Sequence, residues 1–253
     1  MSAATDAALD AHDLDAQDLD AQDLEHVEHG RSELACGRPT TDASRRRRWA
    51  TWPLAVALAL AFVALAGTTA VSAGPGALDD WGHRAAIEMR SPAATAFFEI
   101  VTHLGAGLVV SVAALGVAAV IWRRCPVLAS LILFAGMARP LLSMVLKESV
   151  ARPRPDGDVL VHPSSASFPS GHTFAAVVFW GMLPLVVAAV TSHRVARVAS
   201  VGVAVVAVAL VGASRVYLGA HWLTDVVGSV LVGGACLVLV TAALDHLHRS
   251  PGV

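Results

Sequence analysis

Six long hydrophobic stretches restrict this chain to a membrane-spanning helical fold. Each approaches the roughly 20 apolar residues that an α-helix needs to cross the hydrocarbon core of a bilayer. Backbone groups in lipid must be hydrogen-bonded within the fold, and the stretches lack the alternating pattern of a β-barrel strand. The sequence therefore predicts an all-α integral membrane protein, a six-transmembrane-helix bundle. The predicted spans are residues 50–71, 96–121, 127–146, 173–191, 198–214 and 223–243.

Charge is distributed unevenly along the chain. Residues 1–44 contain 11 of the 20 acidic residues but only 2 of the 18 basic ones. Low hydrophobicity combined with like charge is typical of a disordered segment. We therefore expect a disordered acidic N-terminal tail at 1–44, a six-helix membrane domain at 45–246 and a short C-terminal tail at 247–253.

Arginines in the short loops predict the orientation of the bundle. Arginines 45–48 precede the first span, Arg123 and Arg124 separate the second and third, and Arg194 and Arg197 separate the fourth and fifth. By parity these loops share one side of the membrane, and basic loops face the cytoplasm. We therefore expect a multi-pass protein of the plasma membrane with both termini in the cytoplasm.

Three short polar segments lie where predicted spans begin or end. They are rich in residue types that bind phosphate, and the same parity places all of them at the outer membrane face. Because they share one side, they can form a single active site there. Their polar residues are Lys147 and Arg154 in the first segment, Ser170, Gly171 and His172 in the second, and Ser214, Arg215, His221 and Asp225 in the third.

The cations of these segments are suited to holding a phosphate. Phosphoryl transfer places negative charge on three equatorial oxygens, and fixed cations stabilise that charge. Lys147, the only lysine of the chain, supplies a point charge, whereas Arg154 and Arg215 supply planar forks for bidentate contacts. Taken singly, each cation is better explained as an anchor to lipid headgroups, and we interpret Arg152 in that way.

A helix start and two histidines complete the predicted chemistry. Ser170 precedes an apolar run as a potential N-cap, and Gly171 lets the backbone amides there approach an anion. His172 then points into the same site. His221 and Asp225 are four residues apart, so in a helical turn the carboxylate orients Nδ1 and leaves Nε2 to attack phosphorus. These residues alone also fit a helix cap and an interfacial hydrogen bond, and they do not decide which histidine attacks.

Together the three segments resemble the motifs of the type 2 phosphatidic acid phosphatase superfamily, which shares its site with vanadium-dependent haloperoxidases. The first motif is Lys, six residues and Arg-Pro, matched at 147–155. The second is Pro-Ser-Gly-His, matched at 169–172. The third is Ser-Arg, five residues, His, three residues and Asp, matched at 214–225. The resemblance extends over roughly residues 50–243, and no motif position departs from the pattern.

The resemblance implies a two-step hydrolysis that needs neither a metal nor another cofactor. His221 would attack phosphorus to form a phosphohistidine, and Asp225 would orient it. His172 would protonate the leaving group and then activate the water that regenerates the enzyme. The residues implied to bind the phosphoryl oxygens are Lys147, Arg154, Ser170, Gly171 and Arg215.

A lipid phosphate phosphatase is the leading hypothesis, with a substrate that arrives through the bilayer. Candidate substrates are phosphatidic acid, phosphatidylglycerol phosphate and undecaprenyl diphosphate. We expect neither nucleic acid nor metal as a partner, and the sequence does not indicate an oligomeric state. The alternatives are a lipid phosphotransferase with the same site, a transporter that uses the outer cations as an anion funnel, and a haloperoxidase.

Three polar residues inside the predicted spans fall outside the motifs. Arg139 lies eight residues before Lys147, which on a helix is roughly 12 Å deeper in the membrane. A charge at that depth should face the bundle interior or a wet cavity. Glu99 and His103 are four residues apart and could offer it a partner from one helix face. The set fits either the lining of a substrate pocket or a buried structural pair.

Overall fold

The computed structural model is built from helices, and no strand occurs in the part of the chain that it describes, residues 41–72, 74–161 and 163–247. Most of the predicted acidic tail, residues 1–40, and the end of the chain at 248–253 lie outside the described residues. The all-α class is thereby confirmed. The elements are α2 (Thr41–Ser72), α3 (Ala77–Glu88), α4 (Pro92–Val101), η1 (Thr102–Gly105), α5 (Gly107–Ile121), α6 (Pro126–Val150), α7 (Gly171–Val190), α8 (Arg194–Tyr217) and α9 (Leu223–Leu247).

Within the described residues, five helices are long and apolar enough to cross a membrane, namely α2, α6, α7, α8 and α9. A sixth span forms when α4 with η1 and α5 are taken together. This result agrees with the predicted bundle, with one difference. The sequence predicted a continuous helix over 96–121, whereas the structure bends by 49° where η1 meets α5. Ala106 at the break has an extended backbone, with φ −63° and ψ 130°.

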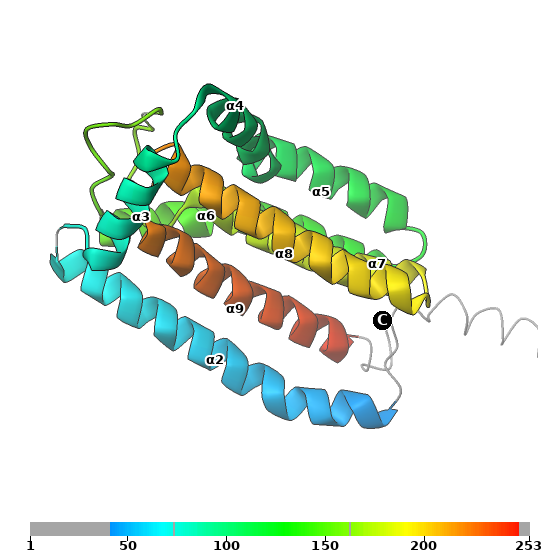
Figure 1. Cartoon of the computed structure of the whole chain (residues 1–253). Helices are drawn as coiled ribbons and strands as arrows, with labels where there is room; N and C mark the ends of the chain where they lie inside the picture. Colours follow the sequence, from blue (N-terminus) through cyan, green and yellow to red (C-terminus); the bar gives the residue numbers. More distant parts are fainter. Residues whose placement is uncertain (1–40, 73, 162, 248–253) are drawn as a thin grey trace, which may run out of the picture. The chain divides into compact units, whose positions relative to one another are not determined.

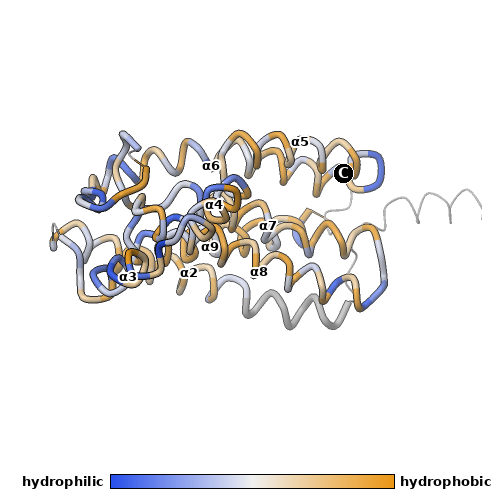
Figure 2. The backbone as a smooth tube through the Cα atoms, turned by 45° about the horizontal axis from the view of Figure 1, so that its top comes forward, coloured by the Kyte–Doolittle hydropathy of each residue, from blue (hydrophilic) through white to orange (hydrophobic). Residues whose placement is uncertain are grey.

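Helix α7 occupies the centre of the bundle. It packs against α5, α6, α8 and α9 (Figure 1), and its residues Thr173 to Val178 are buried. The surrounding helices keep large apolar side chains on their outer faces, for example Val120 and Val195, which are more than four-fifths exposed. Figure 2 shows the hydrophobic colour along the helices and the hydrophilic colour mainly in the loops at their ends. Helices that are apolar on all sides require lipid to cover their outer faces.

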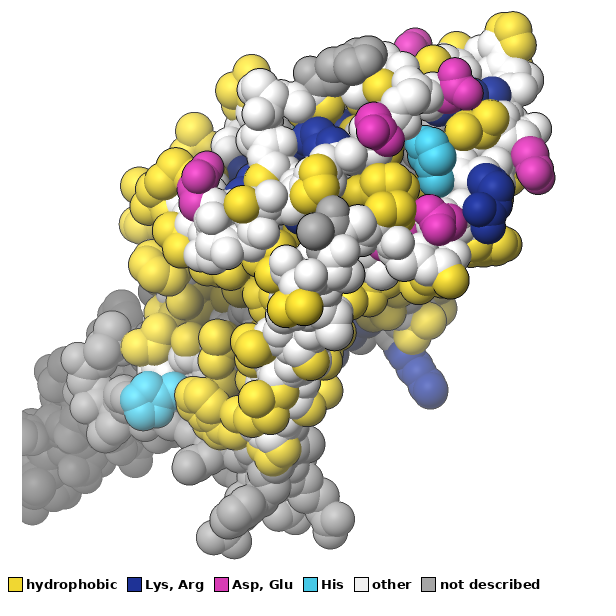
Figure 3. Space-filling view, turned by 90° about the vertical axis from the view of Figure 1, so that its left-hand side faces the viewer, with side chains coloured by type: hydrophobic (Ala, Val, Ile, Leu, Met, Phe, Trp, Pro, Cys, Tyr) yellow, Lys and Arg dark blue, Asp and Glu magenta, His cyan; other side chains and the backbone are white. Residues whose placement is uncertain are grey.

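One end of the bundle brings the predicted motifs together. Helices α6 and α8 end there, α7 and α9 begin there, and the short helix α3 crosses that end and contacts α8 and α9 (Figure 1). Acidic, basic and histidine side chains gather on this face, above the hydrophobic flanks of the helices (Figure 3). The chain direction of successive helices therefore places segments far apart in the sequence at the same end.

Candidate active site

The predicted site residues come from four helix ends and two loops at this end of the bundle. Lys147 and Arg215 lie in the last turns of α6 and α8, and Gly171 and Asp225 lie in the first turns of α7 and α9. The remaining predicted residues follow the same rule, since each lies beside one of these helix ends. They are Arg154 and His221 in loops, Ser170 directly before α7 and His172 in its first turn.

His221 lies between a carboxylate and a guanidinium. Its Nδ1 is 3.3 Å from Asp225 Oδ2, and its Nε2 is 3.3 Å from Arg154 Nη1. His221 precedes the first turn of α9, so a loop and not the expected helical turn brings the pair together. Gly219, with φ +71°, reverses the chain in this loop, and the backbone N–H of His221 donates to the Arg215 carbonyl at 3.2 Å.

The protonation of His221 follows from its surroundings. Burial lowers the pKa of His221 to about 4, although the hydrogen bond to Asp225 acts in the opposite direction. At neutral pH the imidazole is therefore uncharged. Nδ1–H donates a hydrogen bond to the Asp225 carboxylate, because an ionised carboxylate can only accept. Nε2 then carries the lone pair, and it accepts a hydrogen bond from Arg154.

The Asp225 carboxylate is fully buried and held on both oxygens. Oδ2 accepts hydrogen bonds from His221 Nδ1, from the Trp222 backbone N–H at 2.9 Å and from the Ser167 hydroxyl. Oδ1 accepts from Arg152 Nη1 at 2.6 Å. A buried carboxylate with this many partners has a fixed orientation, and it fixes the imidazole in turn.

Arg152 is not an interfacial anchor, and that prediction was wrong. Its side chain is 1% exposed and forms ion pairs with Asp79 and Asp225, each at 2.6 Å. Thr224 also donates to Asp79, from its backbone N–H at 2.8 Å and from its hydroxyl at 2.9 Å. Arg152 is buried because α3 crosses the end of the bundle and brings the Asp79 carboxylate over it.

The other cations of the site are held by oxygen atoms that carry no full charge. Arg154 donates to the carbonyls of Ser165 at 2.6 Å and Ala220 at 2.5 Å, and Lys147 donates to the Ala166 carbonyl. Burial lowers the pKa of the Arg154 guanidinium.

Arg215 is buried and donates to Thr102 Oγ1 at 2.7 Å. Within the described residues neither it nor Lys147 nor Arg154 forms an ion pair. The three cations interact electrostatically with one another. Cations that are grouped without paired carboxylates favour the binding of an anion.

Ser170 connects the start of α7 to α9. It is the N-cap of α7, as predicted, but its side chain makes no capping hydrogen bond and accepts from Thr173 Oγ1 at 3.1 Å. Its backbone N–H donates to the Asp225 carbonyl at 3.3 Å, and its carbonyl accepts from Ser229 Oγ at 2.9 Å. Because Ser170 is fully buried, its role in binding phosphate stays a prediction.

Gly171 and His172 lie beside the grouped cations. A Cβ atom at Gly171 would be 3.7 Å from Ser143 Oγ and 4.0 Å from Lys147 Cε. His172 is half-buried, and its ring makes no hydrogen bond to any described residue. The charge of Arg215 acts on this ring, which places it beside the anion-binding group.

Gly105, directly before the break between η1 and α5, packs against the backbone of His172. A Cβ atom at Gly105 would be 2.6 Å from the His172 carbonyl oxygen and 2.6 Å from Val211 Cγ1. The backbone of η1 therefore touches the first turn of α7 directly, which only glycine permits. This close approach keeps Thr102 in reach of Arg215.

The expected partners of Arg139 do not contact it. Glu99 is exposed, His103 is exposed, and neither forms a hydrogen bond or ion pair with Arg139. Arg139 is 8% exposed, and a Cβ atom at Gly107 would be 3.6 Å from its Nη2. The alternative of a buried structural pair is therefore wrong for these residues.

Asp79 and Ser167 are functional neighbours that the sequence did not reveal. Both contact the carboxylate network around Asp225, yet both lie outside the three motifs. No local pattern links Asp79 to residues some 145 positions later. Among the residues that the structure describes, no group of three or more His, Cys, Asp or Glu side chains could hold a metal ion.

Comparison with known proteins decides the family. The chain is 35% identical over 200 residues to phosphatidylglycerophosphatase B of Bacillus subtilis, a match that covers 77% of this chain and 96% of that protein. The sequence profile of the PAP2 superfamily matches residues 124–249. The chain belongs to the PAP2 superfamily.

A solved structure of a PAP2 protein has the same fold. It is the crystal structure of a transmembrane PAP2-type phosphatidylglycerolphosphate phosphatase from Bacillus subtilis, with a TM-score of 0.66 and 30% sequence identity. The match covers 79% of this chain and 98% of that one. The resemblance to type 2 phosphatidic acid phosphatases is therefore confirmed, and the protein is a membrane-bound lipid phosphate phosphatase. All eight predicted site residues lie within the stretch that the family profile matches.

Proposed function

We propose that this PAP2 enzyme hydrolyses a terminal phosphate on a membrane lipid through a phosphohistidine at His221. The observation that carries the proposal is the position of the His221 ring. Asp225 accepts a hydrogen bond from Nδ1–H, and Nε2 lies 3.3 Å from Arg154 Nη1 within the cation group. A phosphate held by these cations would present its phosphorus to the Nε2 lone pair.

In the first step His221 Nε2 forms a bond to phosphorus, and the bond from phosphorus to the lipid oxygen breaks. Once the phosphate anion is bound beside it, His172 is protonated, and it gives this proton to the departing oxygen, so the lipid leaves as an alcohol. Lys147, Arg154 and Arg215 stabilise the charge on the equatorial oxygens.

In the second step water is the nucleophile. His172, now neutral, accepts a proton from the water as its oxygen bonds to phosphorus. The bond from phosphorus to His221 Nε2 then breaks and inorganic phosphate leaves. His221 returns to its starting state, and His172 is protonated again for the next cycle.

We place the active site on the extracytoplasmic side, with both termini in the cytoplasm. The short loops Trp122–Cys125 and Thr191–His193 lie at the end of the bundle opposite the site, and arginines 123, 124, 194 and 197 lie in or beside them. Basic loops face the cytoplasm. Labelling of single cysteines introduced at Asp158 and at Arg194 in intact cells tests this orientation, because only the first should react with an impermeant reagent.

We propose phosphatidylglycerol phosphate as the substrate, because the relative and the solved structure compared above are both named for that lipid. Phosphatidic acid and undecaprenyl diphosphate remain the comparison substrates. The proposal is tested by phosphate release from all three lipids in detergent with EDTA present. We expect release to survive EDTA and to disappear in His221→Ala. Full activity in His221→Ala, or a phosphorylated acceptor in place of free phosphate, would contradict the hydrolytic mechanism.

A further inference from the structure

Arg139 is a buried cation for which the described part of the chain provides no partner. It is 8% exposed, its Nε is buried without a hydrogen bond, and it forms neither a hydrogen bond nor an ion pair with a described residue. An arginine within a membrane span is costly unless a partner satisfies it, so such residues usually serve a ligand.

The position of Arg139 relates it to the active site. Arg139, Ser143 and Lys147 are spaced four residues apart on α6, so they follow one face of the helix from the interior to the site. Ser143 and Lys147 lie beside Gly171. The charge of Arg139 acts on His172. Arg139 thus lies roughly 12 Å deeper than Lys147 along the helix axis, on the inner side of the leaving-group histidine.

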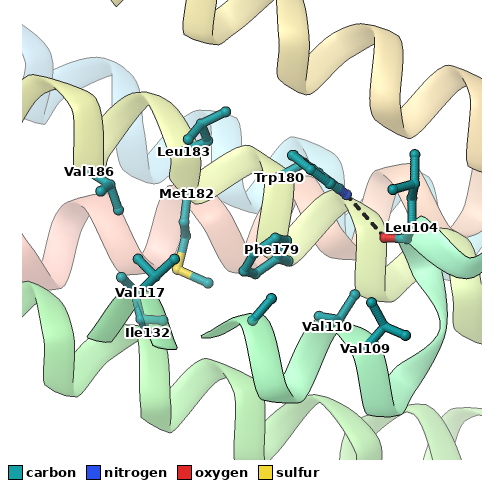
Figure 4. Close-up of a pocket in the computed structure, with 11 residues that line it drawn as sticks. Leu104, Val109, Val110, Val117, Ile132, Phe179, Trp180, Met182, Leu183 and Val186 are labelled. Carbon is teal, nitrogen blue, oxygen red and sulfur yellow. Dashed lines mark hydrogen bonds between the residues drawn. The ribbon is translucent and has the colours of Figure 1, made fainter. Parts of the chain in front are cut away.

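An apolar cavity is lined by residues close in sequence to Gly107, whose Cβ position would be 3.6 Å from Arg139 Nη2. Its volume is about 410 Å³, and it lies between α5, α6 and α7 (Figure 4). Leu104 and Val109, which line it, lie three residues before and two residues after Gly107 in the chain. The lining side chains are apolar, and the one polar atom among them, Trp180 Nε1, donates to the Leu104 carbonyl at 3.0 Å. The cavity therefore suits a hydrocarbon chain.

We propose that Arg139 binds a second phosphate of the substrate, located between the phosphate that is cleaved and the lipid tail. The inference rests on the proposed function. A lipid with its terminal phosphate at His221 has its leaving oxygen at His172, and the next part of the molecule toward the tail reaches Arg139. The first segment of the tail then enters the apolar cavity.

This arrangement separates two classes of substrate. Phosphatidylglycerol phosphate and lipid diphosphates carry a second phosphate in that position, whereas phosphatidic acid carries none. Arg139 is accordingly a specificity-determining residue, and the enzyme should prefer a lipid with two phosphates. Binding of that anion also supplies the counter-charge that the guanidinium lacks.

The test compares kcat/KM on phosphatidylglycerol phosphate and phosphatidic acid with identical acyl chains in the same detergent. A charge-assisted hydrogen bond predicts that Arg139→Met lowers the value for the first lipid by about 10-fold or more, and for phosphatidic acid by less than about 3-fold. Arg139→Lys should retain part of the preference. Arg123→Met, the same change at the exposed opposite end of the bundle, should alter neither value.

Several outcomes would overturn the inference. These are an equal loss on both lipids, no loss on either, or a wild-type enzyme that prefers phosphatidic acid. The last measurement needs no variant, so it remains decisive if Arg139→Met is unstable. If the vanadate concentration that inhibits Arg139→Met by half equals that for the wild type, the site for the cleaved phosphate is intact in the variant. Absence of phosphate release from every lipid by the wild-type enzyme would instead overturn the proposed function.

A lipid diphosphate as a third substrate locates the second phosphate. If Arg139→Met lowers kcat/KM on this lipid by about 10-fold or more, Arg139 reaches a phosphate that is joined directly to the cleaved one. A loss confined to phosphatidylglycerol phosphate shows that a linker between the phosphates is required. Both results support a second phosphate at Arg139 and differ only in its distance from His221.

Discussion

Arg152 and Asp225 form an ion pair of 2.6 Å in which the two side chains are 1% and 0% exposed. The guanidinium donates to Oδ1 of the carboxylate, whereas Oδ2 accepts from the His221 imidazole together with Ser167 and the Trp222 N–H. Asp79 completes the arrangement from α3 with a second ion pair to Arg152. The orientation of the proposed nucleophile therefore depends on a residue 146 positions before Asp225 in the chain.

Asp225→Asn should abolish most activity while leaving substrate binding largely intact. The amide can present its NH₂ to Nδ1 and so favour the wrong tautomer, which in a comparable triad lowers kcat by roughly 10⁴-fold. Single-turnover kinetics in detergent measure the loss. Asp245→Asn, at the opposite end of α9, provides the matched control. A kcat within a few-fold of the wild type would show that Asp225 does not orient His221.

Asp79→Asn should destabilise the fold and reduce kcat, although Asp79 does not touch the substrate. Removing one charge from a buried ion pair typically costs about 3–5 kcal/mol. The thermal unfolding temperature in detergent should therefore be lower in Asp79→Asn. It should change little in Asp80→Asn, which alters the same helix turn. If both variants unfold at the wild-type temperature, the ion pair with Arg152 contributes no stability.

The lowered pKa of His221 predicts that the stability of the fold depends on pH. This pKa is about 4 in the folded protein, against about 6.5 for an unperturbed imidazole. The unfolded chain therefore binds the extra proton first, and stability is lost as pH falls from about 6.5 toward 4, by about 3 kcal/mol in total. Thermal unfolding across this range should show a smaller slope in His221→Gln. His193→Gln, which alters an exposed histidine, should keep the wild-type slope, and equal slopes in all three proteins would contradict the argument.

His172→Ala should affect substrates according to their leaving group. A lipid alkoxide needs a proton, so general-acid catalysis worth roughly 10²–10⁴-fold should be lost. The leaving group of an aryl phosphate is a stable phenolate, which needs no proton. The rate of the first step should therefore fall far less with this substrate. The second step still needs His172 as a base, so the phosphohistidine should accumulate with the aryl substrate. Its absence by mass spectrometry of the His221 peptide would argue against these roles.

Much of the fold follows from local sequence. Long apolar runs identify the spans, since a bilayer demands about 20 such residues, and three motifs identify the site. The break at Ala106 was not predicted, because the two halves together still have the length and mean hydropathy of one span. The close approach of Gly105 to the first turn of α7 exists only in the folded bundle. The buried state of Arg152 was missed for a similar reason. Arg152 lies in the loop after α6 and its counter-ion Asp79 lies on α3, 73 residues earlier, and no spacing rule connects residues so distant.

The contact between Arg154 and His221 has a consequence for the resting enzyme. The lone pair on Nε2 that attacks phosphorus in the proposed mechanism accepts a hydrogen bond from the guanidinium as long as no phosphate is bound. In that mechanism an incoming phosphate would compete for the same guanidinium and draw it away from the imidazole. Substrate binding would then free the Nε2 lone pair for attack, whereas without an anion the lone pair would stay hydrogen-bonded to Arg154.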